Sequence, residues 1–143
     1  MGPPGRLRWR YYSASPRACY HRGALPNDDC LLCRIASGRA GVPLLYEDDL
    51  VVAFDIPEGQ PWRQAPVHFL VIPKEHIPSA REAEARHELA LGRLVTAAAK
   101  VAKGMGISES GYRLASNTGD DAGQTEFHIH LHCLGGRKLG PKG

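Results

Sequence analysis

Residues 126–137 read EFHIHLHCLGGR and carry three of the chain's seven histidines, at every second position. On a β-strand, successive side chains point to opposite faces of the sheet, so residues two apart share a face. This spacing predicts a strand over residues 126–136 with one polar row, made of His128, His130 and His132. The opposite face would be buried, and it is made of Ile129, Leu131 and Cys133.

A row of three imidazoles has three interpretations, and the residues before it bear on the choice. The row can be a solvent-facing polar strip, a metal site that uses all three side chains, or a nucleophile with two flanking histidines that position it and handle protons. The preceding segment NTGDDAGQTEF supplies small residues, amides and hydroxyls. Such groups approach an anion without a repelling charge. A phosphate bound beside the histidines is the simplest interpretation, and it favours the nucleophile.

The rest of the chain predicts two helices and further strands. A short helix is predicted after the capping residues 27–29, with a stop at Gly38, and a long one over residues 79–104, from a Ser cap and the helical spacing of its apolar residues. Strands are predicted at four places, around residues 43–49, 50–56, 67–73 and 111–119. The nearly continuous apolar run of the third is typical of a central strand. Strands joined by short turns, with helices between them, predict an α+β fold with a mainly antiparallel sheet.

Length and charge limit the class of protein. A chain of 143 residues, 43% hydrophobic and 23% charged, has the size and composition of one globular domain. The net charge of +3 depends on five arginines in residues 1–27, a segment without acidic residues. The remainder carries 13 basic and 15 acidic residues, which argues against a nucleic-acid partner. No apolar run reaches the ~18 residues that a membrane span needs.

The cysteines and the first residues bear on location. Four cysteines without a secretory signal favour a reducing compartment, so we predict a cytoplasmic protein. We interpret residues 1–27 as a tail that precedes a single domain of residues 28–143. Because the tail is rich in arginine and free of acids, it is either a disordered extension or a targeting segment. In the second case the location would be mitochondrial.

Several segments together resemble the histidine triad superfamily. The segment GQTEFHIHLHCLGGR is similar to the His-x-His-x-His signature of that superfamily, and its LGGR ending resembles the nucleotide-binding, phosphoramidase branch. The segments DDCLLCRIASG, YEDDLVVAFDI, QAPVHFLVIPKEHI and GYRLASNTGDDAGQ follow in family order, so the resemblance covers about residues 28–137. It implies a HIT-like α+β fold with one short N-terminal helix and one long helix, whose sheet joins that of a second copy in a homodimer.

The resemblance also implies an activity. The expected reaction is hydrolysis of a purine nucleoside phosphoramidate, which releases the nucleoside 5'-monophosphate through a covalent nucleotidyl-histidine. A dinucleoside polyphosphate hydrolase or a nucleotidyltransferase of the same superfamily is an alternative, because the chain ends RKLGPKG and lacks the terminal Trp that phosphoramidase relatives often show. A non-catalytic nucleotide-binding or scaffold module is the alternative from a different class.

Individual residues receive roles from the same resemblance. His130 would be the nucleophile, His132 would stabilise charge on the phosphate, and Thr125 would assist the leaving group. The nucleotide would be bound by Asn117 and Gln124 at the phosphate, Asp55 at the ribose hydroxyls, His68 near the active site, and Leu32, Ile35 and Phe54 as walls of a base pocket. Two departures concern the ribose contact. The chain reads AFDI where the family usually has one more residue before DI, and the loop that follows is longer.

A second site is predicted from Cys30 and Cys33, spaced Cys-x-x-Cys at the start of the first helix. Zn²⁺ takes about four Cys and His ligands, whereas two cysteines alone can equally be a redox pair or part of a helix face. The resemblance implies a structural zinc site that is completed by His76 and His128. His128 would then support the fold without taking part in the reaction, and catalysis would need no added metal.

Overall fold

The computed structural model describes residues 28–142, so the predictions for the tail of residues 1–27 lie outside the described residues. Its elements, in chain order, are α1 (Leu31–Ala36), β1 (Tyr46–Glu47), β2 (Val51–Asp55), β3 (Val67–Pro73), the 3-10 turns η1 (Ala80–Glu82) and η2 (Ala85–His87), α2 (Glu88–Gly104), β4 (Tyr112–Ala115), η3 (Asp120–Ala122) and β5 (Leu131–Gly135). Within this range no helix is long and apolar enough to cross a membrane.

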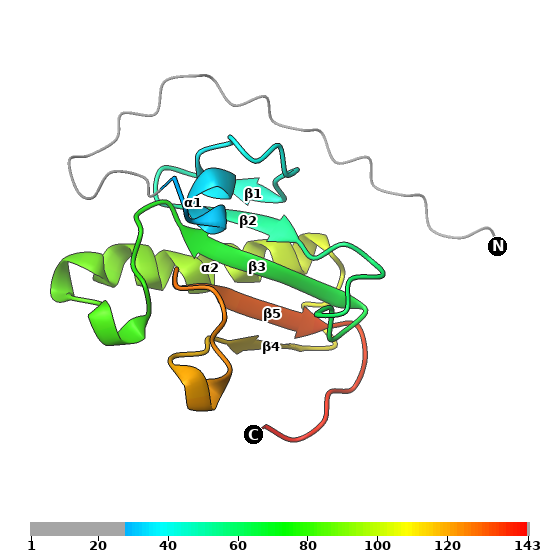
Figure 1. Ribbon diagram of the computed structural model, residues 1–143. Coiled ribbons are helices and arrows are strands. Elements are labelled where there is room, and N and C mark those ends of the chain that lie inside the picture. The colour runs from blue at the N-terminus through cyan, green and yellow to red at the C-terminus, as the bar shows by residue number, and fades with distance from the viewer. Residues whose placement is uncertain (1–27, 143) are drawn as a thin grey trace.

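The five strands form one antiparallel sheet in the order β1-β2-β3-β5-β4 (Figure 1). β3 is the longest strand, with seven residues, and it lies in the centre, as its apolar run predicts. β5 pairs with β3 on one side and with β4 on the other. The predicted α+β class with a mainly antiparallel sheet is therefore confirmed. The structure describes a single chain, so the homodimer stays a prediction.

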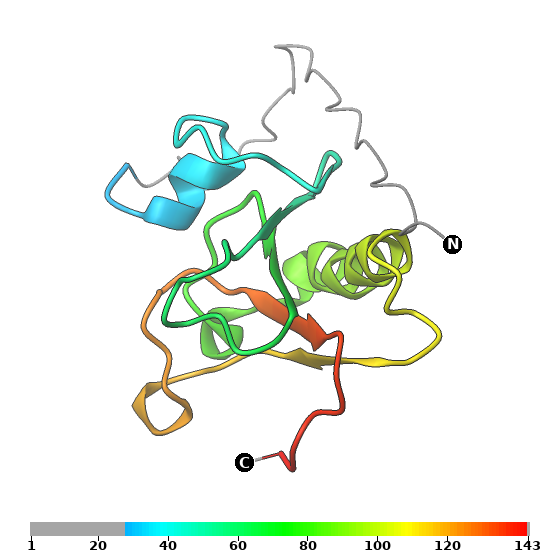
Figure 2. The ribbon, with the colours of Figure 1, turned by 90° about the vertical axis from the view of Figure 1, so that its right-hand side faces the viewer.

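The two helices lie on opposite faces of the sheet (Figure 2). On one face, α2 contributes Leu94, Ala97, Ala98, Val101 and Ala102 to a core that includes Val51, Phe69 and Val71 of the strands. On the other face, α1 contributes Leu32, Ile35 and Ala36 to a second core with Val52, Phe54, Leu70 and Ile72. Because side chains alternate along a strand, β2 and β3 each supply residues to both cores.

Both helices begin later than the sequence predicts. α2 begins at Glu88 because the predicted cap, Ser79, instead accepts from the backbone N–H of Arg81 (3.1 Å) and caps a 3-10 turn. The N-cap of α1 is Cys30, whose Sγ accepts from the backbone N–H of Cys33 (3.4 Å), so the predicted cap among residues 27–29 is wrong. The glycine stop is confirmed, since Gly38 follows α1 with a φ of 77°, a conformation that favours glycine.

The histidine strand is also shorter than predicted. β5 begins at Leu131, so only His132 of the three histidines lies on it. The backbone N–H of Ile129 donates to the carbonyl oxygen of Ile77 (2.6 Å), which lies in the loop after β3, and this bond takes the preceding residues out of the sheet. The side chains of the three histidines nevertheless lie toward the face of the sheet that carries α1. His128 contacts the two cysteines at the start of α1, His132 is opposite Leu70 of the core on that face, and the ring of His130 is 4.9 Å from that of His132.

Candidate active site and metal centre

His128 is fully buried, and its two ring nitrogens have different partners. Nε2 lies 2.9 Å from the carbonyl oxygen of Pro73, the last residue of β3. A carbonyl oxygen can only accept, so Nε2 carries the proton and donates it, and Nδ1 is left with a lone pair. Burial, followed by the charges of His76 and His130, lowers the pKa of His128 to about 4 despite the Pro73 bond, so the ring is neutral at physiological pH.

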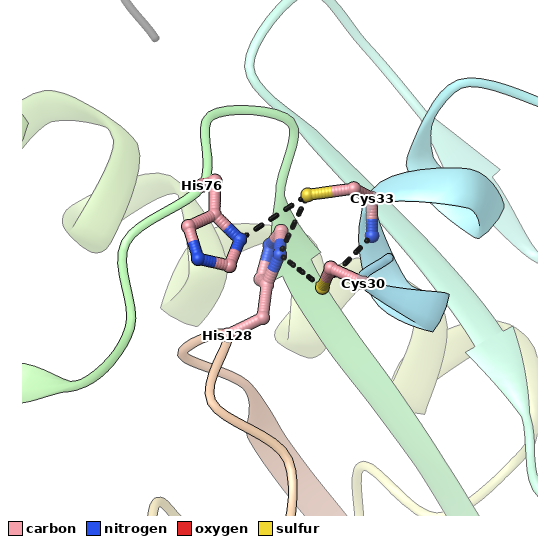
Figure 3. Close-up of side chains that lie close together, drawn as sticks. All are labelled: Cys30, Cys33, His76 and His128. Atoms are coloured by element: carbon pink, nitrogen blue, oxygen red, sulfur yellow. Dashed lines mark hydrogen bonds between the residues drawn. The ribbon is translucent and has the colours of Figure 1, made fainter. Parts of the chain in front are cut away.

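The lone pair of His128 faces the two cysteines of α1 (Figure 3). Nδ1 lies 3.6 Å from Sγ of Cys30 and 3.4 Å from Sγ of Cys33, and Nδ1 of His76 lies 3.2 Å from the Cys33 sulfur. The N-terminus of α1 supplies both sulfurs, the turn after β3 supplies His76, and the segment before β5 supplies His128. Four ligand atoms from three parts of the chain therefore meet within 4.8 Å of one another.

The donor set of this cluster fits a metal ion. With bond lengths of about 2.3 Å to sulfur and 2.0–2.1 Å to nitrogen, the sulfur–nitrogen edge of a tetrahedral zinc site is about 3.6 Å. The three sulfur–nitrogen distances in the cluster, 3.2–3.6 Å, are close to that edge. The bond from His128 to Pro73 also leaves the correct nitrogen unprotonated and fixes the ring, as backbone acceptors do in metal sites. The predicted residues are thus brought together, and they could hold a metal such as zinc.

His130 is held in the opposite tautomer. Its Nδ1 lies 2.8 Å from the carbonyl oxygen of His128, so Nδ1–H donates and the lone pair is on Nε2. The side chain is 7% exposed, and its ring is 4.9 Å from that of His132, in an edge-to-face arrangement. A neutral imidazole with a fixed Nδ1–H and a free Nε2 lone pair is the form that acts as a nucleophile.

His132 lies on β5 directly opposite Leu70 of β3, and its Nδ1 is 2.9 Å from Nε2 of His68. Burial, followed by the charges of His130 and His68, lowers its pKa to about 4. His68 is 1% exposed, and its Nδ1 lies 3.1 Å from the backbone nitrogen of Gln64. The structure thus places His68 in direct contact with His132. Sequence reasoning missed Gln64, because the group that makes the contact is a backbone amide, which every residue except proline carries.

The segment predicted to lie beside a bound phosphate, residues 117–127, runs from shortly after the end of β4 to His128. β4 ends at Ala115, which pairs with His132, so Asn117 follows close to the histidines. Gln124 is buried, and its side-chain amide is engaged by the backbone on both sides: Oε1 accepts from Gly119 N–H (2.9 Å), and Nε2 donates to the carbonyl oxygens of Pro78 (2.9 Å) and Glu126 (3.1 Å). Thr125, next to it, is exposed. Gln124 therefore shapes the loop, and its contact with phosphate stays a prediction.

The predicted base-pocket walls lie together in the core beneath α1. Leu32, Ile35 and Phe54 are each no more than 5% exposed and belong to one cluster. Asp55 is not brought to this face, since Phe54 and Ile56 on either side of it both belong to that cluster and side chains alternate. Its carboxylate instead lies 3.3 Å from the guanidinium of Arg63. Burial raises the pKa of Asp55, and the Arg63 charge opposes that rise. Its role at the ribose stays a prediction.

Comparisons with known proteins agree with this arrangement. A model of the HIT domain matches residues 41–139. The chain is 52% identical over 99 residues to a purine nucleoside phosphoramidase of Escherichia coli. The aligned region covers 68% of this chain and 79% of that protein. Among solved structures, a HIT family hydrolase from Clostridium thermocellum superposes with a TM-score of 0.74 at 42% identity, covering 81% and 97% of the two chains. One from Legionella pneumophila gives 0.72 at 38% identity, covering 78% and 96%.

Proposed function

The chain belongs to the HIT family, and on that premise we propose that it hydrolyses purine nucleoside phosphoramidates to the nucleoside 5'-monophosphate and an amine, with His130 as the nucleophile. The observation that carries the proposal is the 2.8 Å bond from His130 Nδ1 to the His128 carbonyl oxygen. It leaves the Nε2 lone pair for attack on phosphorus. The same bond stabilises the positive charge that the ring gains once Nε2 is bonded to phosphorus.

The reaction proceeds in two displacements. In the first, His130 Nε2 attacks the α-phosphorus, a bond forms between them, and the substrate's P–N bond breaks. The departing nitrogen takes a proton, which the Thr125 hydroxyl relays from solvent. In the second, water attacks phosphorus, a P–O bond forms, the bond to His130 breaks, and the proton of the water returns to solvent. The covalent intermediate divides one difficult displacement into two easier ones.

The phosphate and nucleoside contacts follow from the surrounding elements. We assign the phosphate oxygens to His132 and Asn117, with Gln124 next to them in the loop that it braces. The base is assigned to the face covered by α1, against Leu32, Ile35 and Phe54. For Asp55 to accept from the ribose hydroxyls, its carboxylate has to leave Arg63 and turn toward the face of the sheet to which the base is assigned.

For the cluster of Cys30, Cys33, His76 and His128, we propose a structural zinc ion. All four ligand positions are taken by the protein, which is typical of structural sites rather than catalytic ones. The ion would link the start of α1 to the segment before β5, which leads to His130. His130 would remain the reacting group, and turnover would need no further metal.

We also propose that two copies associate through β4. This strand forms one edge of the sheet and, within the described residues, pairs only with β5. An edge strand with unpaired backbone groups can add a strand from a second chain. Light scattering on the purified protein tests this proposal: a mass of two chains supports it, and a monomer at micromolar concentration contradicts it.

A substrate comparison tests the proposed activity. The purified chain is assayed with the 5'-phosphoramidates of adenosine and guanosine and with diadenosine tetraphosphate. We expect kcat/KM for the phosphoramidates to exceed that for the tetraphosphate by about tenfold or more, a difference of about 1.4 kcal/mol in transition-state stabilisation. A preference for the tetraphosphate would favour the polyphosphate hydrolase. Binding of adenosine monophosphate without turnover of any of the three would favour the scaffold module.

A further inference from the structure

A chain of hydrogen bonds runs from the loop between β2 and β3 to His132. The backbone nitrogen of Gln64 lies 3.1 Å from Nδ1 of His68, and Nε2 of His68 lies 2.9 Å from Nδ1 of His132. A backbone N–H can only donate, so Nδ1 of His68 must accept. A neutral imidazole that accepts at one nitrogen carries its proton on the other. Nε2 of His68 therefore donates to Nδ1 of His132, and His132 in turn carries its proton on Nε2.

The surroundings keep both rings neutral, as this order of bonds requires. His68 is 1% exposed, and burial, followed by the charge of Arg63, lowers its pKa. The pKa of His132 is lowered to about 4. A second proton on His68 would sit on Nδ1 and face the Gln64 N–H, donor against donor. The direction of the chain of bonds is therefore set by the backbone at one end.

We propose that His68 is a positioning residue, which acts through His132 by fixing it as the Nε2–H tautomer. His130 is fixed as the Nδ1–H tautomer by the His128 carbonyl oxygen. Two neighbouring rings, 4.9 Å apart, thus present complementary groups: a lone pair on His130 for phosphorus and an N–H on His132 for the phosphate oxygens. The inference rests on the proposed function for the role of His132, but the tautomers themselves can be observed without substrate.

The loop that supplies the Gln64 amide is held at several points. Arg137, in the LGGR segment, donates to the carbonyl oxygen of Gln64 (3.0 Å). Arg63 donates to the carbonyl oxygens of Ile56 and Pro66, at the two ends of the loop. These bonds fix the Gln64 peptide in place, whereas the Gln64 side chain is exposed. The loop, which is longer than usual for the family, thus holds the backbone N–H of Gln64 in position to donate to His68.

The tautomers are tested by NMR on the full chain with ¹⁵N-labelled histidine, since the one- and two-bond couplings of an imidazole show which nitrogen carries the proton. We expect His132 and His68 to be Nε2–H tautomers and His130 to be an Nδ1–H tautomer. The His132 signals are assigned from their loss in His132→Asn. A His132 ring protonated on Nδ1 would overturn the inference, whatever the activity of the protein.

Two substitutions of His68 test the catalytic consequence. In His68→Gln, the side-chain amide nitrogen replaces Nε2 as donor to His132, whereas His68→Phe keeps a ring of similar size without any donor. We expect kcat with adenosine phosphoramidate to fall about tenfold or more in His68→Phe, with KM within about threefold, and to recover in His68→Gln. A nucleotide ligand would instead change KM, and a core residue would change stability without recovery by Gln. Equal kcat in the two variants would overturn the inference.

A backbone variant covers the case in which His68→Phe does not fold. Gln64→Pro removes the N–H that His68 accepts, and Gln64→Ala keeps it. We expect His68 to become a mixture of tautomers and kcat to be lower, by about tenfold, in the Pro variant than in the Ala variant. The same kcat and the same tautomers in both would contradict the inference. If the wild-type protein hydrolyses no phosphoramidate, the proposed function fails, and the NMR result alone decides the tautomers.

Discussion

Each histidine between Phe127 and Cys133 meets a different partner, and the partner decides which ring nitrogen carries the proton. His128 donates from Nε2 to the carbonyl oxygen of Pro73, which leaves Nδ1 to face the sulfurs of Cys30 and Cys33. His130 donates from Nδ1 to the backbone of His128, and His132 accepts at Nδ1 from His68. Three identical side chains can therefore serve as metal ligand, nucleophile and donor to phosphate. Backbone groups, rather than other titratable side chains, set the first two.

Burial of His132 predicts that the protein loses stability in mild acid. The pKa of His132 is lowered from 6.5 to about 4 in the folded protein, so the unfolded chain takes up a proton first. The contribution of neutral His132 to the free energy of unfolding is fully present above about pH 6.5. It is lost as the pH falls from there through about 4. We expect the free energy of unfolding in urea to be smaller at pH 5 than at pH 7.5.

The variant His132→Asn is the control for this pH effect. Asn keeps an oxygen that can accept from His68 but does not titrate, so the loss between pH 7.5 and pH 5 should be smaller than in the wild type. His68 and His128, whose pKa values are also lowered by burial, are present in both proteins and leave part of the effect. An identical loss in wild type and variant would show that His132 does not contribute.

At the scale of elements, the turn between β1 and β2 depends on one of two adjacent acids. The carboxylate of Asp48 accepts from the backbone N–H groups of Leu50 and Val51 (2.8 and 2.9 Å), from the Tyr46 hydroxyl (2.8 Å) and from Arg93 of α2 (2.7 Å). Asp48 thereby closes the hairpin and ties it to the long helix. The side chain of its neighbour, Asp49, is 83% exposed and lies 3.6 Å from Arg93.

We predict that Asp48→Ala lowers the free energy of unfolding by about 2–3 kcal/mol, because it leaves several partly buried donors without an acceptor. Asp49→Ala is the matched control and should change it by no more than about 0.5 kcal/mol. Urea denaturation of both variants gives the two values. Equal effects of the two substitutions would mean that net charge, rather than the geometry of the turn, holds the hairpin.

The element boundaries show where prediction from the sequence stops. The central strand β3 and the hairpin are predicted because apolar runs and turn residues are local signals. The start of α2 and the start of β5 are not, because Ser79 caps a 3-10 turn and Ile129 bonds to Ile77, contacts that depend on tertiary packing. The cluster of cysteines and histidines is predicted only through the family resemblance, since α1 and β5 are distant in the sequence.

At the scale of the whole molecule, the cluster of Cys30, Cys33, His76 and His128 joins α1 to the segment before β5. Apart from this cluster, α1 is held by its small core with β2 and β3. A metal ion in the cluster would therefore stabilise the position of α1, and with it the face of the sheet that we assign to the base. Removal of the metal ion should therefore increase the mobility of α1 before that of the rest of the fold.

We predict about one zinc ion per chain in the purified protein and a lower melting temperature after chelation, because metal binding adds to folding stability. Mass spectrometry of metal content and thermal melts with and without chelator measure the two effects. Cys30→Ser should lose zinc, whereas Cys133→Ser, which changes a buried cysteine of the other core, should keep it. Metal-free protein whose melting temperature is unaffected by chelator would contradict the site.

The nucleophile is tested most directly by the turnover number of His130→Ala with adenosine phosphoramidate, measured beside its affinity for adenosine monophosphate. The substitution removes the Nε2 that attacks phosphorus but few of the contacts that bind the nucleotide. We predict that kcat falls at least about 1,000-fold while the affinity stays within about tenfold. A variant that turns over within tenfold of the wild-type rate would contradict covalent catalysis by His130.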